Sequence, residues 1–167
     1  TLNKKIIAAK CYKVYWEKGI NNVTYNDVIK YSGISKFSFY KTFKDEDELQ
    51  RESIKFYYES YMSEIIKEVY KYNDVLSALS FFDNKNAEKN YKPCFFNACN
   101  YKKYELGNKT KNILKKIEVD CKKMFFDLIT RHVKFYNFKI NKIDIKALSS
   151  FLVHSFNLIN ILLLNKA

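Results

Sequence analysis

Residues that break helices are scarce in this chain, which contains only three glycines and one proline among its 167 residues. A collagen-like chain or a β-sandwich rich in turns would need many more of them. Hydrophobic residues make up 47% of the sequence, which argues against disorder and provides enough apolar surface for a core. The composition therefore predicts an all-α fold.

The N-terminal region begins with the pattern of two helices. Apolar residues recur at helical spacing from about residue 3 to Lys18, and Gly19 follows as a stop of the left-handed type. Thr24 and Asp27 have the spacing of a capping box, which predicts that a second helix begins there. Gly33 then ends this second helix.

A third short helix is predicted directly after this glycine. Ser35 is placed to cap it, and the helix runs to about Lys41. Ile34, Phe39 and Phe43 share its inward side. Two helices too short to be stable alone, joined by a tight glycine turn, match a helix-turn-helix, in which the second helix enters the major groove of DNA.

Longer helical patterns follow this segment. Asp45 and Glu48 form a second predicted capping box, which opens one long helix that reaches about Val69. After a short break the pattern resumes as far as Phe82, and the polar stretch Asp83–Asn90 is predicted to be a connection without helical periodicity.

The C-terminal part of the chain is predicted to contain three more helices. Pro93 fits the first turn of one that ends near Glu105, and two apolar stripes, starting at Ile113 and Ile145, predict the last two. Because the final helix is apolar on more than one side, we expect it to pack against a second subunit; the alternative is a terminal helix buried in its own domain. In such a dimer the last two helices of each copy would form a four-helix bundle. Its expected interface residues are Met124, Leu128, Leu152, Phe156, Ile159 and Leu163.

Positive charge is concentrated near the N-terminus. The net charge is +12, and residues 1–44 hold nine lysines against Glu17 and Asp27, a net charge of +7. An excess of lysine favours an anionic partner such as nucleic-acid phosphate or acidic lipid, although the codon usage of an AT-rich genome is another source of lysine. The concentration of this charge in residues 1–44 favours a nucleic-acid-binding segment on a more neutral body.

The sequence lacks motifs for metal, cofactor or enzyme chemistry. The four cysteines contain no C-x-x-C pair, and His132 and His154 are the only histidines available as further ligands. We therefore expect no metal site and no cofactor, and we interpret the cysteines as ordinary buried thiols in a reducing cytoplasm. A Gly-rich phosphate loop and a Ser/His/Asp arrangement are also lacking, so the sequence predicts no enzyme.

Membrane and export signals are lacking as well. The most apolar run, Phe156–Leu164, is interrupted by Asn157 and Asn160 and falls well short of the roughly 20 residues that span a bilayer. The N-terminus has no apolar segment of the signal-peptide type, so we expect a cytoplasmic protein without a membrane partner. Since the chain starts at Thr1 and not at Met, we expect a short N-terminal arm to precede it.

An ordered set of residues between Ile7 and Leu49 resembles one known family. Together these residues approximate a helix that ends in Gly, followed by the patterns T-x-x-D-I-A, A-G-V-S-K-G-T-F-Y and x-x-F-x-x-K-x-x-L. The matching residues are Ile7, Cys11, Val14, Tyr15, Gly19, Thr24, Asp27, Val28, Gly33-Ile34-Ser35-Lys36, Tyr40, Phe43 and Leu49. This stretch resembles the TetR family of transcriptional regulators.

The resemblance implies a DNA-binding domain over residues 1–46 and a helical body over residues 47–167 that dimerises and binds a small-molecule effector. By position it implies DNA contacts from Thr24, Ser35, Lys36, Ser38 and Tyr40, and we add Lys41 and Lys44 because of their charge. Tyr40 is expected at the surface because Phe39 and Phe43 already occupy the inward positions. The implied partners are a palindromic operator in double-stranded DNA and a second copy of the chain, and repression is the usual mode of regulation in this family.

Two residues depart from the family pattern. Phe37 replaces the usual glycine, and it either contacts a thymine methyl group or hinders close approach to the groove. Glu46 replaces the lysine that commonly opens the fourth helix, which removes a phosphate contact and repels the DNA backbone. We therefore expect a DNA specificity unlike the family average.

Aromatic residues of the body are candidates for an effector site, because phenol and phenyl rings suit an amphipathic or aromatic ligand. The predicted ligand-binding residues are Tyr57, Tyr61, Phe95, Tyr101 and Phe125. One alternative function is a basic helical module that binds protein partners or a membrane surface without recognising a specific operator.

Overall fold

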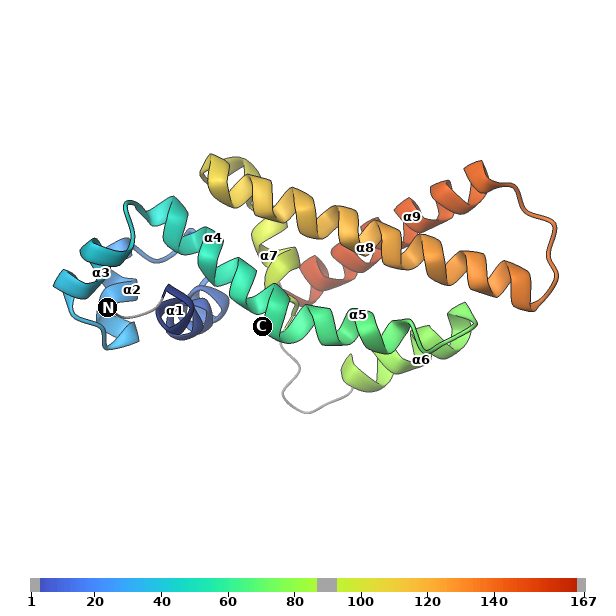
Figure 1. Cartoon of the computed structure of the whole chain (residues 1–167), viewed down its shortest axis with the longest axis horizontal. Coiled ribbons are helices and arrows are strands. Elements are labelled where there is room, and N and C mark those ends of the chain that lie inside the picture. Colours follow the sequence, from blue (N-terminus) through green and yellow to red (C-terminus); the bar gives the residue numbers. More distant parts are fainter. Residues whose placement is uncertain (1–3, 87–92, 165–167) are drawn as a thin grey trace. The chain divides into compact units, whose positions relative to one another are not determined.

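The computed structural model describes residues 4–86 and 93–164, and every regular element in these two ranges is a helix (Figure 1). In chain order the elements are α1 (Lys4–Lys18), α2 (Tyr25–Ser32), α3 (Lys36–Thr42), α4 (Glu46–Tyr57), the π-helical turn η1 (Tyr58–Met62), α5 (Ser63–Val69), α6 (Val75–Asn86), α7 (Phe95–Tyr101), the 3-10 turn η2 (Lys103–Glu105), α8 (Asn108–Phe135) and α9 (Lys142–Leu164). The predicted all-α fold is confirmed. None of the described helices is long and apolar enough to cross a membrane.

The chain packs as two compact units. The first, the head unit, comprises the residues up to Met62 together with Cys94–Ile117, and the second, the body unit, comprises Ser63–Pro93 and the residues from Glu118 onward. The head unit thus holds α4, α7 and the start of α8 in addition to the first three helices. The boundary expected between residues 46 and 47 stays a prediction about function, since packing does not divide the chain there.

Local sequence signals set the ends of the first helices. Gly19 and Gly33 have φ angles of +87° and +66°, the left-handed conformation that follows α1 and α2. Thr24 and Asp27 form the capping box of α2, in which each side chain accepts a hydrogen bond from the other residue's backbone N–H. The predicted positions of these two helices are therefore confirmed.

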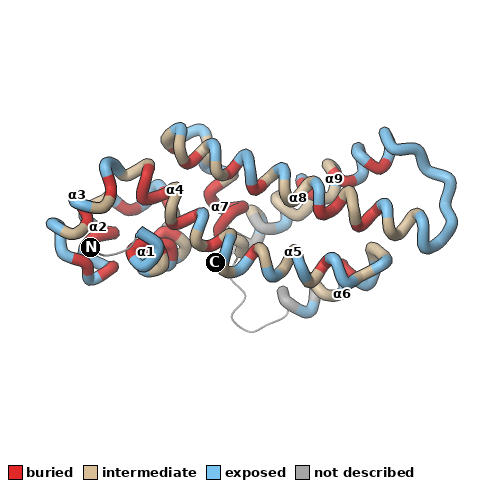
Figure 2. Tube along the Cα trace, in the orientation of Figure 1, coloured by how far each residue is buried: buried red, intermediate tan, exposed pale blue. Residues whose placement is uncertain are grey.

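Buried residues from several helices form the core of the head unit, and Figure 2 marks the buried positions in red along the chain. Burial of a large apolar side chain stabilises a fold by about 1.5–3 kcal/mol. Such burial holds α2 and α3 in place, because helices this short are not stable alone. The largest fully buried side chains of this core include Ile7, Tyr15, Phe39, Phe43, Leu49, Ile54, Phe95 and Phe96.

The middle of the chain departs from the predicted pattern at two points. The long helix expected after Asp45 is interrupted by η1, whose wider turn shifts the side chains that follow it around the helix axis. α6 continues to Asn86, beyond the predicted end at Phe82, so the first part of the expected polar connection is helical. Residues 87–90 of that connection lie outside the described residues.

The helix expected from Pro93 to Glu105 is shorter than predicted. Pro93 lies before the N-cap residue Cys94, whose ψ angle of 123° is not helical, so the helix starts only at the next position. α7 ends at Tyr101, and the chain tightens into η2 before α8 begins. The proline therefore does not occupy the first turn of α7.

The body unit has a core of its own. Side-chain hydrogen bonds join α8 to the end of α5, to the residues that follow it and to the start of α6. The imidazole Nδ1 of His132 accepts a hydrogen bond from the backbone N–H of Val75 at 3.2 Å. Arg131 donates from Nε to the carbonyl oxygen of Tyr72 at 3.0 Å and from a terminal nitrogen to that of Val69 at 3.2 Å. The buried residues of this core are Val69, Ala78, Met124, Phe125, Leu128 and Val153.

Two of the side chains predicted for a dimer interface lie inside this core. Met124 is 4% exposed and Leu128 is 0% exposed, so neither has surface left for a partner, and this part of the prediction was wrong. An apolar stripe on α8 is explained by packing within the body unit itself. Leu152 and Phe156 are partly buried against the same core.

Other apolar side chains of α9 are exposed. Ile159 is one of them, whereas the side chain of Leu163 lies outside the part of the chain that the structure describes. The expectation that α9 is apolar on more than one side is confirmed. The exposed large apolar residues on this helix are Ile143, Leu148, Phe151, Leu158, Ile159 and Leu162.

Candidate nucleic-acid interface

α3 is a seven-residue helix that depends on its cap and on one buried side chain. The hydroxyl oxygen of Ser35 accepts a hydrogen bond from the backbone N–H of Ser38 at 3.2 Å, as the sequence predicts. Near the other end, the hydroxyl of Thr42 donates to the carbonyl oxygen of Ser38 at 2.6 Å. Phe39 is fully buried on the inward side and anchors the helix to the core of the head unit.

The opposite side of α3 faces outward. Phe37 is 75% exposed and Tyr40 is 58% exposed, and both lysines of the helix, Lys36 and Lys41, are exposed. The ammonium group of Lys41 lies 5.8 Å from the centre of the Phe37 ring, within the range of a cation–π interaction. This side of the helix therefore offers two cations, a phenol and an apolar ring, groups that bind phosphates and base edges.

Tyr40 is held in place by a residue that the sequence analysis did not single out. The ring of Tyr25 meets the Tyr40 ring edge-on at 5.6 Å, and it meets the buried Phe39 ring in the same way at 5.6 Å. Burial raises the pKa of Tyr25 to about 12, so its hydroxyl stays protonated at neutral pH. A tyrosine at the first position of α2 carries no pattern that indicates this role.

All eight predicted DNA-binding side chains reach the surface. Ser38 is half-buried and the others are exposed: Thr24, Ser35, Lys36, Phe37, Tyr40, Lys41 and Lys44. The hydroxyl of Thr24 is already used in the capping box, where it accepts from the N–H of Asp27 and donates to its carboxylate at 2.6 Å. Contact of these residues with DNA remains a prediction.

The acidic segment Asp45–Glu48 is bound by donors of the head unit. Asp45 accepts a hydrogen bond from the N–H of Glu48 at 2.7 Å and so caps α4, as predicted. The reciprocal bond of the predicted capping box is replaced, because Glu48 accepts from the N–H of Lys44 at 3.0 Å and pairs with the ammonium group of Lys4. The hydrogen bond from Lys4 is the main reason why the pKa of Glu48 lies below its usual range.

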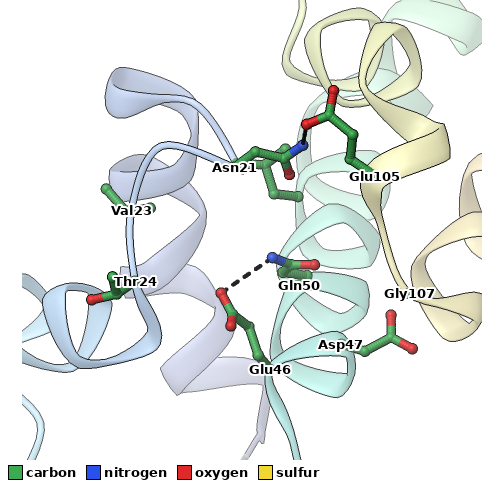
Figure 3. A pocket seen from close by; sticks show the side chains of 9 residues that line it. Asn21, Val23, Thr24, Glu46, Asp47, Gln50, Glu105 and Gly107 are labelled. Atoms are coloured by element: carbon green, nitrogen blue, oxygen red, sulfur yellow. Dashed lines mark hydrogen bonds between the residues drawn. The ribbon is translucent and has the colours of Figure 1, made fainter.

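An open groove of about 510 Å³ lies beside this segment (Figure 3). Glu46 faces it and accepts a hydrogen bond from the side chain of Gln50 at 3.4 Å, while burial raises the pKa of its carboxyl group. Asn21 donates to Glu105 at 2.7 Å across another part of the groove. The lining residues are Ile20, Asn21, Val23, Thr24, Glu46, Asp47, Gln50, Glu105 and Gly107, and none of them is basic.

None of the five predicted ligand-binding residues lines this groove. Tyr57 stacks on Tyr61 with ring centres 5.6 Å apart and meets Phe95 edge-on at 5.5 Å, so the structure brings three of the five together in the head unit. Tyr101 is exposed, and Phe125 belongs to the core of the body unit. An effector site at these residues remains a prediction.

The surroundings of the cysteines determine whether their thiols are reactive. Burial raises the pKa of Cys11 to about 12 and lifts that of Cys99 above its usual value, which keeps both thiols protonated. Among the residues that the structure describes, no group of three or more His, Cys, Asp or Glu side chains is arranged to hold a metal ion.

Comparison of the sequence with profiles of protein families and with curated protein sequences gives no match. Solved structures do match. The reduced form of NemR from E. coli superposes with a TM-score of 0.77 at 11% identity, over 94% of this chain and 84% of that protein. A regulatory protein TetR from Rhodobacter sphaeroides gives a TM-score of 0.71 at 16% identity, over 96% and 97% of the two chains.

A third solved structure agrees with these two. It is a TetR transcriptional regulator from Streptomyces avermitilis, with a TM-score of 0.70 at 14% identity over 92% of this chain and 81% of that protein. All three superpositions cover more than nine-tenths of this chain. The chain therefore has the fold of the TetR-type regulators.

Proposed function

We propose that this protein is a TetR-like, sequence-specific DNA-binding transcriptional regulator. The observation that carries the proposal is the outward side of α3, which presents Lys36, Tyr40 and Lys41 from a capped and anchored helix in a chain with the TetR fold. In a helix-turn-helix the second helix enters the major groove, where lysine binds phosphates or guanine and a hydroxyl binds base edges.

The distribution of charge supports DNA as the partner. The segment up to Lys44 carries a net charge of +7 in a chain with a total of +12. Because neutralised phosphates release counterions, such an excess strengthens binding to any nucleic acid, and the groups on α3 then supply selectivity.

We further propose that this protein has a non-enzymatic role and acts in the cytoplasm.

We further propose that the protein acts as a homodimer on a palindromic operator. Exposed apolar residues on α9, such as Phe151, Leu158 and Leu162, would be covered by a second copy. A two-fold dimer places two copies of α3 about 34 Å apart when they read half-sites one DNA turn apart. The operator would then be palindromic.

The regulatory part of the proposal is repression that a small molecule relieves. An effector that favours a different spacing of the two recognition helices weakens operator binding, and a coupling of about 1–3 kcal/mol corresponds to a roughly 5- to 150-fold change in affinity. The aromatic cluster of Tyr57, Tyr61 and Phe95 supports an amphipathic or aromatic ligand.

Selection of bound fragments from random DNA tests the proposal. We expect enrichment of one palindromic sequence, and we expect the purified protein to bind it at least about a thousandfold more tightly than a scrambled fragment. Equal affinity for both fragments would favour the second candidate function, a basic helical module that docks on protein partners or membranes. The N-terminal charge favours that module as much as it favours DNA, so salt dependence alone does not separate the two.

A further inference from the structure

The N-terminus of α8 is capped by a side chain from another helix. Gly107 stands at the N-cap position, because its carbonyl oxygen accepts the first intrahelical hydrogen bond from Lys111 at 2.9 Å. A glycine has no side chain to cap the helix. The carboxylate of Asp47, in the first turn of α4, accepts instead from the N–H groups of Lys109 and Thr110, at 2.9 Å each.

Further contacts strengthen this connection. The buried hydroxyl of Thr110 donates to the Asp47 carboxylate at 2.7 Å and lies 3.1 Å from its backbone carbonyl oxygen. The ammonium group of Lys109 pairs with Asp45 at 2.6 Å. Burial opposes the ionisation of Asp47, but these hydrogen bonds outweigh it and hold the pKa of its carboxyl group below the usual range.

Space explains the glycine at position 107. A Cβ atom there would lie 2.2 Å from Cγ of Asp47 and within 2.5 Å of both carboxylate oxygens (Figure 3 shows the two residues side by side). Its backbone is not in the left-handed region, so the glycine is required by the approach of Asp47 and not by its own conformation. The pair of Asp47 and Gly107 therefore forms one unit, called the α4–α8 clamp here.

The α4–α8 clamp lies close to α3 along the chain. Asp47 follows the end of α3 by only a few residues, with the buried Phe43 between them. α8 begins in the head unit and continues past Ile117 into the body unit. The clamp thus fixes the start of the helix that leads to the body unit against the segment that directly follows the recognition helix.

We propose that Asp47 is a positioning residue for DNA recognition, which holds α3 in its binding orientation by capping α8. This inference rests on the proposed function and deepens it, since it names the point at which the position of α8 acts on the recognition helix. Asp47 touches no DNA in this scheme. A displacement of α8 on effector binding would act on α3 through these hydrogen bonds.

Three variants of the full chain test the clamp. Asp47→Asn removes the charge and one acceptor, and Gly107→Ala forces the carboxylate away without a change of charge. Glu52→Gln is the matched control, because it removes a charge from the same helix at a residue that pairs with its neighbour Arg51 and has no predicted DNA contact. We expect the first two to reduce the ratio of operator to scrambled-DNA affinity by a factor of about 5 to 150, and the control to leave it within about twofold.

A fourth variant separates positioning from helix capping. In the double variant Asp47→Ala with Gly107→Asp, the new aspartate caps α8 from its own N-cap position, while the connection through Asp47 is lost. We expect the thermal stability lost in Gly107→Ala to be recovered, and the operator selectivity to remain low. Recovery of both properties would show that Asp47 only caps a helix and would overturn the inference, as would normal selectivity in Asp47→Asn.

Amide hydrogen exchange in the absence of DNA keeps this test independent of the proposed function. We expect the double variant to protect Lys109 and Thr110 like the parent chain but to exchange faster between Phe39 and Phe43. Unchanged exchange in that segment would overturn the clamp's effect on α3. If the parent chain selects no operator, the proposed function fails, and the exchange data alone decide whether the clamp positions α3.

Discussion

Replacement of Lys36 by alanine gives a quantitative test of the outward side of α3. Lys36 lies in the first turn of this helix, is exposed, and pairs with no carboxylate among the described residues. Its charge is therefore available for a DNA phosphate. The affinity for DNA falls with rising salt because bound lysines release counterions, and the slope of log K against log salt is about −0.9 per neutralised phosphate.

The expected change in slope follows from the proposed two-fold dimer. Each protomer loses one contact, so Lys36→Ala should reduce the slope by about 1.8 per dimer. Between about 50 and 200 mM salt, the parent protein should then lose about tenfold more affinity than the variant. Fluorescence anisotropy with the selected operator, measured at four or five salt concentrations, resolves a difference of this size.

Lys67→Ala is the matched control for this experiment. Lys67 is exposed on α5 in the body unit, and its ammonium group pairs with Glu64 at 2.7 Å. The substitution changes the net charge by the same amount at a site without a predicted DNA contact, so the slope should stay as in the parent protein. An equal change in both variants, or no change in Lys36→Ala, would refute the assignment of Lys36 to a phosphate.

Gly33→Ala should destabilise the protein by about 1–2 kcal/mol in urea denaturation, because φ is +66° and the added Cβ meets no atom within 4 Å, so that the whole effect comes from the backbone. Hydrogen bonds from lysine ammonium groups lower the pKa of Asp45 and of Glu48 in the folded protein. The stability that these ionised carboxylates provide should therefore be complete above about pH 5 and lost as pH falls below about 4. Urea titrations at several pH values measure this dependence. Phe151→Glu should convert a dimer to monomers in sedimentation experiments without loss of helical circular dichroism, because the side chain is 67% exposed in the single chain; a persistent dimer would contradict the predicted use of α9.

The parts of the fold that the sequence predicts well depend on local interactions. Ser35 and Thr24 cap their helices through backbone groups three residues away, so a short pattern is enough to identify them. Gly33 ends α2 through its own backbone conformation. The outward position of Tyr40 follows from the inward positions of its neighbour Phe39 and of Phe43, because a helix of known register has only one buried side.

The parts that were not predicted depend on residues far apart in the chain. Met124 and Leu128 have the spacing of an interface stripe, but the pattern does not show whether the partner surface belongs to the same chain or to another copy. The contact between Asp47 and Thr110 joins residues 63 positions apart. Periodicity in a single sequence does not indicate a contact between residues so far apart. The glycine at position 107 is the one sequence feature that this contact requires.

The acidic turn that opens α4 shows how such a contact changes the functional interpretation. As a sequence, Asp45–Glu48 looks like a surface that repels the DNA backbone. In the structure, Asp47 binds the N-terminus of α8, and Asp45 and Glu48 pair with Lys109 and Lys4. Lys4 and Lys109 are consequently less available for a phosphate than Lys36, Lys41 and Lys44, whose ammonium groups pair with no carboxylate among the described residues.

The acidic residue at position 46 links DNA affinity to DNA specificity in the proposed function. With a lysine at position 46, α4 would supply a phosphate contact, and base recognition would depend on a separate helix. With Glu46 facing the groove instead, the proposed function requires Lys36 and Lys41 to contact phosphates from the same short helix that presents Phe37 and Tyr40. Under the proposed function, any change that tilts α3 would weaken phosphate binding and base recognition together, so a small displacement transmitted through the head unit would release the operator.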